Sequence, residues 1–275
     1  MKTLRFSYKM QLDFDDFIQK HRFTLKCIPV DNRRQQIIEL HKEIFPNEFL
    51  EEDRDSFGNV CIYGYAEKPH NHFSVEVTGV AQTGLANYEM AVETHKLGMY
   101  KYATYYTQPG KNLCEYFSGF HFQENAGNYA KALCMMEKLY RDFQYVSGAT
   151  GISTTAEDAW TLGRGVCQDY SHIMISLCQM AHIPARYVVG MLIGEGLSHA
   201  WVKILENGIW IGLDPTNNLI VDSQHIKISN GRDYHDCTIN QGMFVGNAKQ
   251  TQEVAVSVEE ITTDNSLGYE QLSGQ

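Results

Sequence analysis

The chain has 275 residues, a mass of 31.4 kDa and a formal net charge of −10, with 43% hydrophobic and 20% charged residues. This balance is typical of a folded globular protein and excludes a disordered one, and the acidic charge argues against a nucleic-acid partner. The N-terminus lacks the apolar run of a signal peptide, and no segment has 18 consecutive apolar residues. We therefore expect no membrane span and a cytoplasmic protein.

The seven cysteines form no disulfide or zinc pattern. Their number is odd, no two of them make a CxxC motif, and their density is far below that of a disulfide-stapled scaffold. We therefore expect free thiols in a reducing compartment, and the question becomes which thiol carries chemistry. The cysteines are Cys27, Cys61, Cys114, Cys134, Cys167, Cys178 and Cys237.

The first 85 residues have the alternating pattern of β-strands. Apolar residues occupy every second position within 4–10, 23–27 and 73–81, which is the period of a half-buried strand. Residues 35–45 fit both a strand and a helix face, and we favour a strand because strands flank them. The pattern predicts an antiparallel β-sandwich-like domain over residues 1–85.

Residues 86–125 are interpreted as a connection between two domains, because they are rich in Gly, Tyr and Asn. Beyond them, apolar residues at helical spacing predict a helix over 128–143. The sequence Thr154–Asp158 indicates the capped start of a shorter helix, and Gly163 its end.

A third helix is predicted to begin close to Cys167, behind two glycines, and to end before Pro184. Antiparallel strands are expected to follow it, with a tight hairpin turn at Asn207-Gly208, a strong short-range hairpin signal. Residues 126–275 should therefore form an α+β domain. The expected strands cover 186–193, 200–205, 209–213 and 253–258.

Cys167 is the first candidate for chemistry. A thiol at the start of a helix meets the positive end of the helix dipole and unsatisfied backbone N–H groups, which favour its thiolate form. By residue type alone, an inert buried cysteine is the commoner outcome. The glycine-rich entry to the helix favours a nucleophile instead.

A thiolate nucleophile needs a neighbouring base, and the base needs an orienting group. His199 opens one strand of the predicted hairpin and Asp214 closes the other. In an antiparallel hairpin, the numbers of two directly paired residues add to twice the number at the centre of the turn. For a turn at Asn207-Gly208 this sum is 415, and the numbers of His199 and Asp214 add to 413. The two residues should therefore lie within one rung of being cross-strand partners. The hairpin thus predicts an imidazole beside a carboxylate.

Three motifs, in this order, resemble those of the transglutaminase-like superfamily of bacterial cysteine proteases: Gly165–Asp169 (GVCQD), His199–Val202 (HAWV) and Leu213–Asn218 (LDPTNN). Accompanying pieces also resemble the family: Ser153–Glu157, Ile183–Tyr187 and Gly231–Tyr234. The first 85 residues resemble the β-rich region that often precedes this domain, including Phe57–Asn59. Lys203 departs from the pattern, because the family often has an acidic residue there, and this leaves substrate preference open.

The resemblance implies a papain-like core, with a cysteine at a helix N-terminus and histidine and aspartate on antiparallel strands. It implies acyl chemistry through a thioester, with Cys167 as nucleophile, His199 as general base and then acid, and Asp214 as orienter. The backbone N–H of Cys167 is the natural first donor to an oxyanion. Trp160 and Gln168 are the candidates for the second donor.

Four further residues are candidates to line the cleft: Trp201, Arg232, Asp233 and Tyr234. We expect no metal or other cofactor, because neither the pair His70 and His72 nor the spacing of His172 and Cys178 from Cys167 follows a standard zinc pattern.

The expected activity is attack on an amide of a peptide or protein, with water completing the reaction as in a cysteine peptidase or amidase. A protein-glutamine transglutaminase would share the thioester and differ only in using an amine as acceptor. A catalytically silent interaction module of the same fold is the alternative from another class. The sequence favours hydrolysis, implies no membrane or nucleic-acid partner, and leaves the oligomeric state open.

Overall fold

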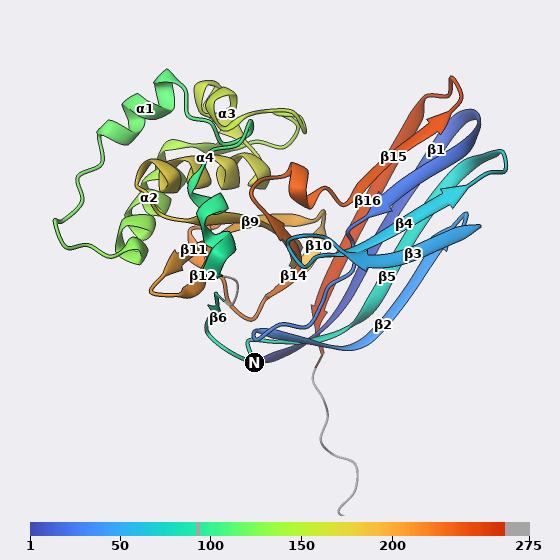
Figure 1. Cartoon of the computed structure of the whole chain (residues 1–275), viewed down its shortest axis with the longest axis horizontal. Coiled ribbons are helices and arrows are strands. Elements are labelled where there is room, and N and C mark those ends of the chain that lie inside the picture. Colours follow the sequence, from blue (N-terminus) through green and yellow to red (C-terminus); the bar gives the residue numbers. More distant parts are fainter. Residues whose placement is uncertain (92–93, 262–275) are drawn as a thin grey trace, which may run out of the picture.

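The computed structural model describes residues 1–91 and 94–261, which form two large antiparallel sheets, with the helices gathered on one of them (Figure 1). An eight-stranded sheet is built around the N-terminal strands, and a six-stranded sheet lies beneath the helices. Figure 1 shows the eight-stranded sheet as a curled layer on the side away from the helices. The predicted α+β class with an antiparallel N-terminal domain is confirmed.

The long strand β1 (Lys2–Leu25) is the spine of the eight-stranded sheet. Its first half pairs with β5 on one side and β16 on the other, and its last residues pair with β4 and β15. The alternating side chains Leu4, Phe6, Tyr8 and Met10 are buried, because every second residue of a strand points to the same face. The other members are β2 (Gln35–Phe45), β3 (Phe49–Arg54), β4 (Val60–Ala66), β5 (His70–Thr83), β10 (Gly194–Gly196), β15 (Asn240–Val245) and β16 (Gln250–Glu260).

Two predictions on this sheet have different outcomes. The ambiguous segment 35–45 is a strand, β2, as favoured. The strands β15 and β16, however, fall within the range 126–275 that was assigned to the second domain, yet they pair with β1. Their alternating pattern marked them as strands but carried no information about their partner. Residues 262–275 of that range lie outside the described residues.

The six-stranded sheet forms the base of the core domain. Helix α4 packs on it and is flanked by α2 and α3, and its residues from Asp169 to Gln179 are all buried. The strands are β6 (Glu89–Met90), β9 (Ala185–Leu192), β11 (His199–Glu206), β12 (Ile209–Asp214), β13 (Leu219–Ile220) and β14 (His225–Gly231). The helices are α1 (Lys111–Ser118), α2 (Asn128–Asp142), α3 (Ala156–Leu162) and α4 (Cys167–Met180), and two 3₁₀ turns are η1 (Thr94–Lys101) and η2 (His235–Cys237). A small parallel pair joins β7 (Gln144–Tyr145) to β8 (Arg164–Gly165).

The expected connection 86–125 belongs largely to the core domain, because it contributes β6 to the sheet and α1 to the helical layer. The three predicted helices are present as α2, α3 and α4. Thr155 is the N-cap of helix α3, and its side chain accepts a hydrogen bond from the Asp158 N–H. The helix ends at the C-cap Gly163, which has φ +72°. Among the described helices, none is long and apolar enough to cross a lipid bilayer.

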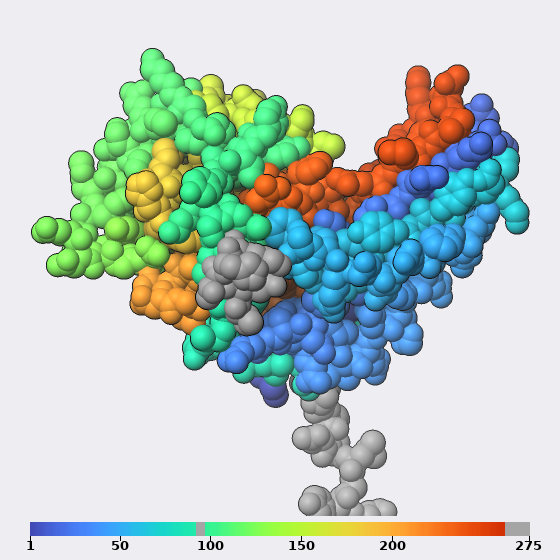
Figure 2. Space-filling view, in the orientation of Figure 1, coloured from blue at the N-terminus to red at the C-terminus, as the bar shows by residue number. Residues whose placement is uncertain are grey.

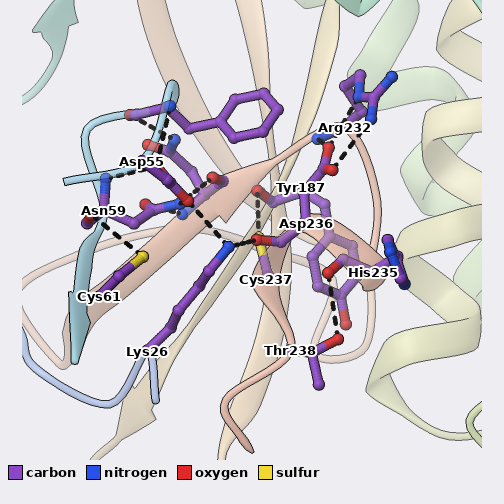
Figure 3. Close-up of polar contacts among 12 residues, drawn as sticks. Lys26, Asp55, Asn59, Cys61, Tyr187, Arg232, His235, Asp236, Cys237 and Thr238 are labelled. Carbon is purple, nitrogen blue, oxygen red and sulfur yellow. Dashed lines mark hydrogen bonds and ion pairs between the residues drawn. The ribbon is translucent and has the colours of Figure 1, made fainter. Parts of the chain in front are cut away.

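The two domains meet at a buried polar joint (Figure 3). The Asn59 side chain donates to the Asn230 carbonyl at 2.8 Å and accepts from the Asn230 N–H at 2.8 Å. Lys26 lies between the Asp55 carboxylate, at 2.9 Å, and the Asp236 carbonyl, at 2.7 Å. The motif Phe57–Asn59 of one domain therefore binds the end of β14 in the other domain through the Asn59 side chain.

Candidate active site

Cys167 is the first residue of α4, the central helix of the core. Its side chain is half-buried, whereas the rest of the helix from Asp169 to Gln179 is buried. The thiol is therefore held by a rigid element but remains within reach of solvent.

The turn into α4 is shaped by Asp169. Its Oδ2 accepts hydrogen bonds from the Val166 N–H at 2.7 Å and from the Thr150 hydroxyl at 2.6 Å. A Cβ on Gly165 would lie 2.4 Å from the same oxygen, so a side chain at this position would displace the carboxylate. The glycine that made Cys167 a candidate is thus required by the helix cap.

The hairpin β11–β12 brings His199 and Asp214 together. Asn207 and Gly208 both have positive φ, +48° and +80°, as a type I′ turn requires. The pairs Val202–Leu213 and Glu206–Ile209 each add to 415, which is the register predicted from the turn. In that register His199 and Asp214 are diagonal neighbours on one face, and His199 Nε2 lies 2.7 Å from Asp214 Oδ2.

His199 is held between Asp214 and Cys167. Burial of the ring would lower its pKa, but hydrogen bonds with the Asp214 and Cys167 side chains raise the pKa of His199 from 6.5 to about 10. Because Nε2 is engaged by Asp214, Nδ1 is the ring nitrogen left for the thiol. The three predicted residues therefore converge, although 32 and 15 positions separate them along the chain.

Asp214 is fully buried and surrounded by donors. Its Oδ2 also accepts from the Asn217 side-chain amide at 2.8 Å, and Oδ1 accepts from the N–H groups of Thr216 and Asn217 at 3.1 and 3.3 Å. Burial would raise the pKa of this carboxyl, but the hydrogen bonds from His199 and His225 hold it well below its usual value. Asp214 is therefore a carboxylate that fixes the imidazole.

Cys167 and His199 lie in a cleft of about 650 Å³ between the two domains. The core domain supplies one wall, and β1, β15 and β16 of the eight-stranded sheet supply the other. In Figure 2 the surface is hollowed between the helical half and the red segment that rises toward the β15–β16 turn.

The other predicted site residues are distributed differently. Gln168 and Tyr234 line the cleft. Trp160 packs against Tyr116 with tilted rings, whose centroids lie 3.9 Å apart, and borders a separate shallow hollow beside α1 and α3. Its aromatic neighbours, which are far from it in sequence, determine this position.

Trp201, Arg232 and Asp233 also lie away from the cleft wall. Trp201 is 1% exposed and packs edge-on against His225 behind the site. Arg232 forms a two-pronged ion pair with Asp236 at the domain joint, at 2.8 and 3.0 Å. Buried Asp233 accepts from the His235 N–H at 2.8 Å and so shapes the turn that carries Tyr234.

Lys203, the departure from the family pattern, is buried. Its ammonium group lies 2.5 Å from Glu89 Oε2, and Arg186 binds the other oxygen of Glu89 at 3.0 Å. Glu89 belongs to β6, within the segment that was predicted to be a connection. The unusual lysine thus serves to anchor that segment to the core sheet.

His225 is a residue of the site that the sequence reasoning missed. It begins β14, its ring is almost completely buried, and its Nε2 lies 3.4 Å from Asp214 Oδ2. The alternation of Ile226 and Ile228 behind it could have revealed the strand but not the contact with Asp214.

His199, Asp214 and His225 also have the donor types of a metal site, since their ligand atoms all lie within 4.8 Å of one another. Two of the three are buried, and the hydrogen bonds from His199 and His225 to Asp214 already occupy these atoms. The arrangement as it stands supplies a thiol, a base to accept its proton and a carboxylate that orients the base.

Two family models match the chain: "Transglutaminase-like superfamily" over residues 119–215, and "Bacterial transglutaminase-like N-terminal region" over residues 4–82. An uncharacterised protein of Mycobacterium leprae is 36% identical over 124 residues, which are 42% of this chain and 44% of that protein. The chain thus spans less than half of that relative. An uncharacterised protein of Mycobacterium tuberculosis is 26% identical over 237 residues, 74% of this chain and 76% of its own.

A solved structure described as a "putative cysteine protease" from Cytophaga hutchinsonii has the same fold. It superposes with a TM-score of 0.75 at 24% identity, over 96% of this chain and 93% of that one. The likeness covers both sheets, so the arrangement of the two domains is shared.

Proposed function

Because this chain belongs to the transglutaminase-like superfamily, with a bacterial transglutaminase-like N-terminal region, we propose that it is a thiol-dependent enzyme that cleaves amide bonds of a peptide or protein. One observation carries the proposal: His199 lines the same cleft as Cys167, and its Nε2 lies 2.7 Å from the buried Asp214 carboxylate. This is the relation of nucleophile, base and orienting group that acyl transfer requires.

In the first half of the reaction, His199 holds, as an imidazolium, the proton that the Cys167 thiol has given up, and the sulfur attacks the amide carbon. The carbon–sulfur bond forms and the carbonyl oxygen becomes an oxyanion. The Cys167 N–H, which as the first of the helix has no partner within it, donates to that oxygen. The carbon–nitrogen bond then breaks as the leaving amine takes the proton from His199, and a thioester remains.

In the second half, His199 takes a proton from water, and the hydroxide attacks the thioester carbon. The carbon–sulfur bond breaks, the acid leaves and the thiol recovers the proton. Asp214 stabilises the imidazolium in both halves without changing its own protonation.

We favour water over an amine as the acceptor. An incoming lysine would approach as an ammonium group, and among the described residues that line the cleft there is no Asp or Glu to hold it. We place the reaction in the cytoplasm, because all seven cysteines are free and a nucleophilic thiol must stay reduced.

The experiment compares wild type with Cys167→Ala, and with Cys114→Ala as a matched control that removes an exposed thiol elsewhere. Mass spectrometry follows alkylation of the native protein by iodoacetamide at pH 6, and turnover is measured on an activated ester and on peptide amides. We expect Cys167 to be alkylated first, and turnover to be lost only in Cys167→Ala. Alkylation of Cys167 no faster than that of Cys114 and Cys134 would refute the proposal and favour a silent interaction module.

Partition of the thioester between water and an added primary amine then distinguishes the two reactions. A peptidase or amidase releases mainly free acid at millimolar amine. Predominant amide formation under these conditions would identify a transglutaminase.

A further inference from the structure

The cleft at Cys167 is built in large part by the eight-stranded sheet. Tyr8 and Leu12 of β1 line it, as do residues of β15 and of β16, where Gln250 and Gln252 are exposed. Gln252 pairs with Leu12 across the two strands, so the β16 side of this wall is fixed to the middle of β1. The sheet therefore presents a rigid surface to anything that reaches the thiol.

This cleft has an unusual composition for an acidic protein. One residue in five of the chain is charged, yet none of the described residues lining the cleft is Asp, Glu, Lys or Arg. A groove of similar size in the eight-stranded sheet differs: its lining includes Lys9, Lys42, Glu43, Glu51, Glu52 and Glu76. The absence of charge is therefore particular to the cleft.

Neutral hydrogen-bonding groups take the place of charges. The cleft is lined by five tyrosines and by the amides of Gln168, Asn240, Gln241, Gln250 and Gln252. Such groups bind the N–H and C=O groups of an extended peptide and pack against apolar or aromatic side chains. A charged side chain would lose its hydration here and find no counter-charge, because the charge of His199 is already balanced by Asp214.

Resting on the function proposed above, we propose that the N-terminal sheet is the specificity wall of the enzyme, and that its substrate is an extended peptide segment without charged side chains beside the reacting amide.

Binding tests this without depending on catalysis. Full-length Cys167→Ala protein is titrated with fluorescent octapeptides of Tyr, Leu, Ser and Gln, and with versions that carry Lys or Glu at the two central positions. We expect the neutral peptide to bind at least about tenfold more tightly than both charged versions. Equal binding of the three peptides, or no binding of the neutral one at millimolar concentration, would overturn the proposal.

A charge placed on the wall should redirect this preference. Gln252→Lys should favour the Glu peptide over the Lys peptide by about two- to fivefold in Kd, and Gln252→Glu should reverse this order. Thr251→Lys is the matched control, because Thr251 is exposed on the same strand, adjacent in sequence, and lies outside the cleft lining. An equal response to Thr251→Lys would show that net charge, and not the wall, sets the preference.

The two proposals fail separately. If Cys167 of the wild type is acylated by an activated ester while charged and neutral peptides bind alike, the enzyme assignment stands and the specificity wall is wrong. If the neutral peptide binds selectively but Cys167 is not acylated, the wall stands and catalysis is refuted.

Discussion

His225 Nε2 lies 3.4 Å from Asp214 Oδ2, the same oxygen that accepts a hydrogen bond from His199 at 2.7 Å. The other ring nitrogen of His225 lies 3.1 Å from Asp222 Oδ1, at the surface. His225 thus supports Asp214 at the same oxygen as His199, and we expect it to act as a positioning residue.

Replacement of His225 should alter kcat more than KM. His225→Leu leaves Asp214 with one donor fewer in a buried site, and we expect kcat to fall about tenfold with KM within about twofold. His225→Gln can still place an amide N–H at the position of Nε2 and should recover most of the loss. Steady-state kinetics on one peptide, with melting temperatures for both variants, test this; equal kcat in the two variants would contradict it.

Asp214 should control how stability depends on pH. The pKa of His199 is about 10 in the folded protein against 6.5 normally, so between these values the folded state holds a proton that the unfolded state releases. The stabilisation is complete below pH 6.5 and is lost as the pH rises through about 10, at up to about 1.4 kcal/mol per pH unit. In Asp214→Asn, the pKa of His199 should fall. The contribution of His199 to the decrease of the unfolding free energy with rising pH should then disappear.

Urea unfolding of both proteins at several values from pH 6.5 to 9.5 measures this difference. Other groups titrate in the same window, but they are common to both proteins and cancel in the comparison. Equal slopes in wild type and Asp214→Asn would show that the carboxylate does not hold the proton on His199.

Gly165→Ala should weaken the cap of α4. Its Cβ would lie 2.4 Å from Asp169 Oδ2, so the carboxylate must give up its bond to the Val166 N–H or the helix must shift. We expect a loss of about 1–3 kcal/mol of unfolding free energy and a slower reaction of Cys167 with iodoacetamide. Gly151→Ala is the control, because nothing lies within 4 Å of a Cβ there.

Asn59→Ala should loosen the joint between the domains. The substitution removes both partners of the Asn230 backbone, which is buried, at a cost of about 1–3 kcal/mol for each group left unsatisfied. Asn47→Ala, at an exposed position of the same domain, should change the stability by less than about 0.5 kcal/mol. Denaturant unfolding of the full chain measures both, and similar losses in the two variants would contradict the role of the joint.

Local signals predicted much of the site. The Asn207-Gly208 turn fixes the register of its own hairpin, so the proximity of His199 and Asp214 could be derived from residue numbers alone. The glycines before Cys167 likewise indicate the helix start. The meeting of the helix with the hairpin depends on packing between distant segments, and only the resemblance to a family predicted it.

Long-range pairing is what the sequence did not reveal. The alternation of Val254, Val256 and Val258 marks a strand equally well for either sheet, because it records one buried face and not the neighbouring strand. The same holds for His225, whose contact with Asp214 arises only when β14 lies beside β9. The neutral lining of the cleft could not be predicted either, since it combines residues from both ends of the chain.

The pairing of β16 with β1 has a consequence for biosynthesis. Residues 4–14 of β1 leave the ribosome before β5 and pair with it soon afterwards, but their other edge waits for residues 250–260. Until residues 250–260 have been translated, that edge offers unpaired N–H and C=O groups to any other strand, which is a hazard for aggregation. Arrest of translation before residue 250 should therefore yield a nascent chain that depends on chaperones.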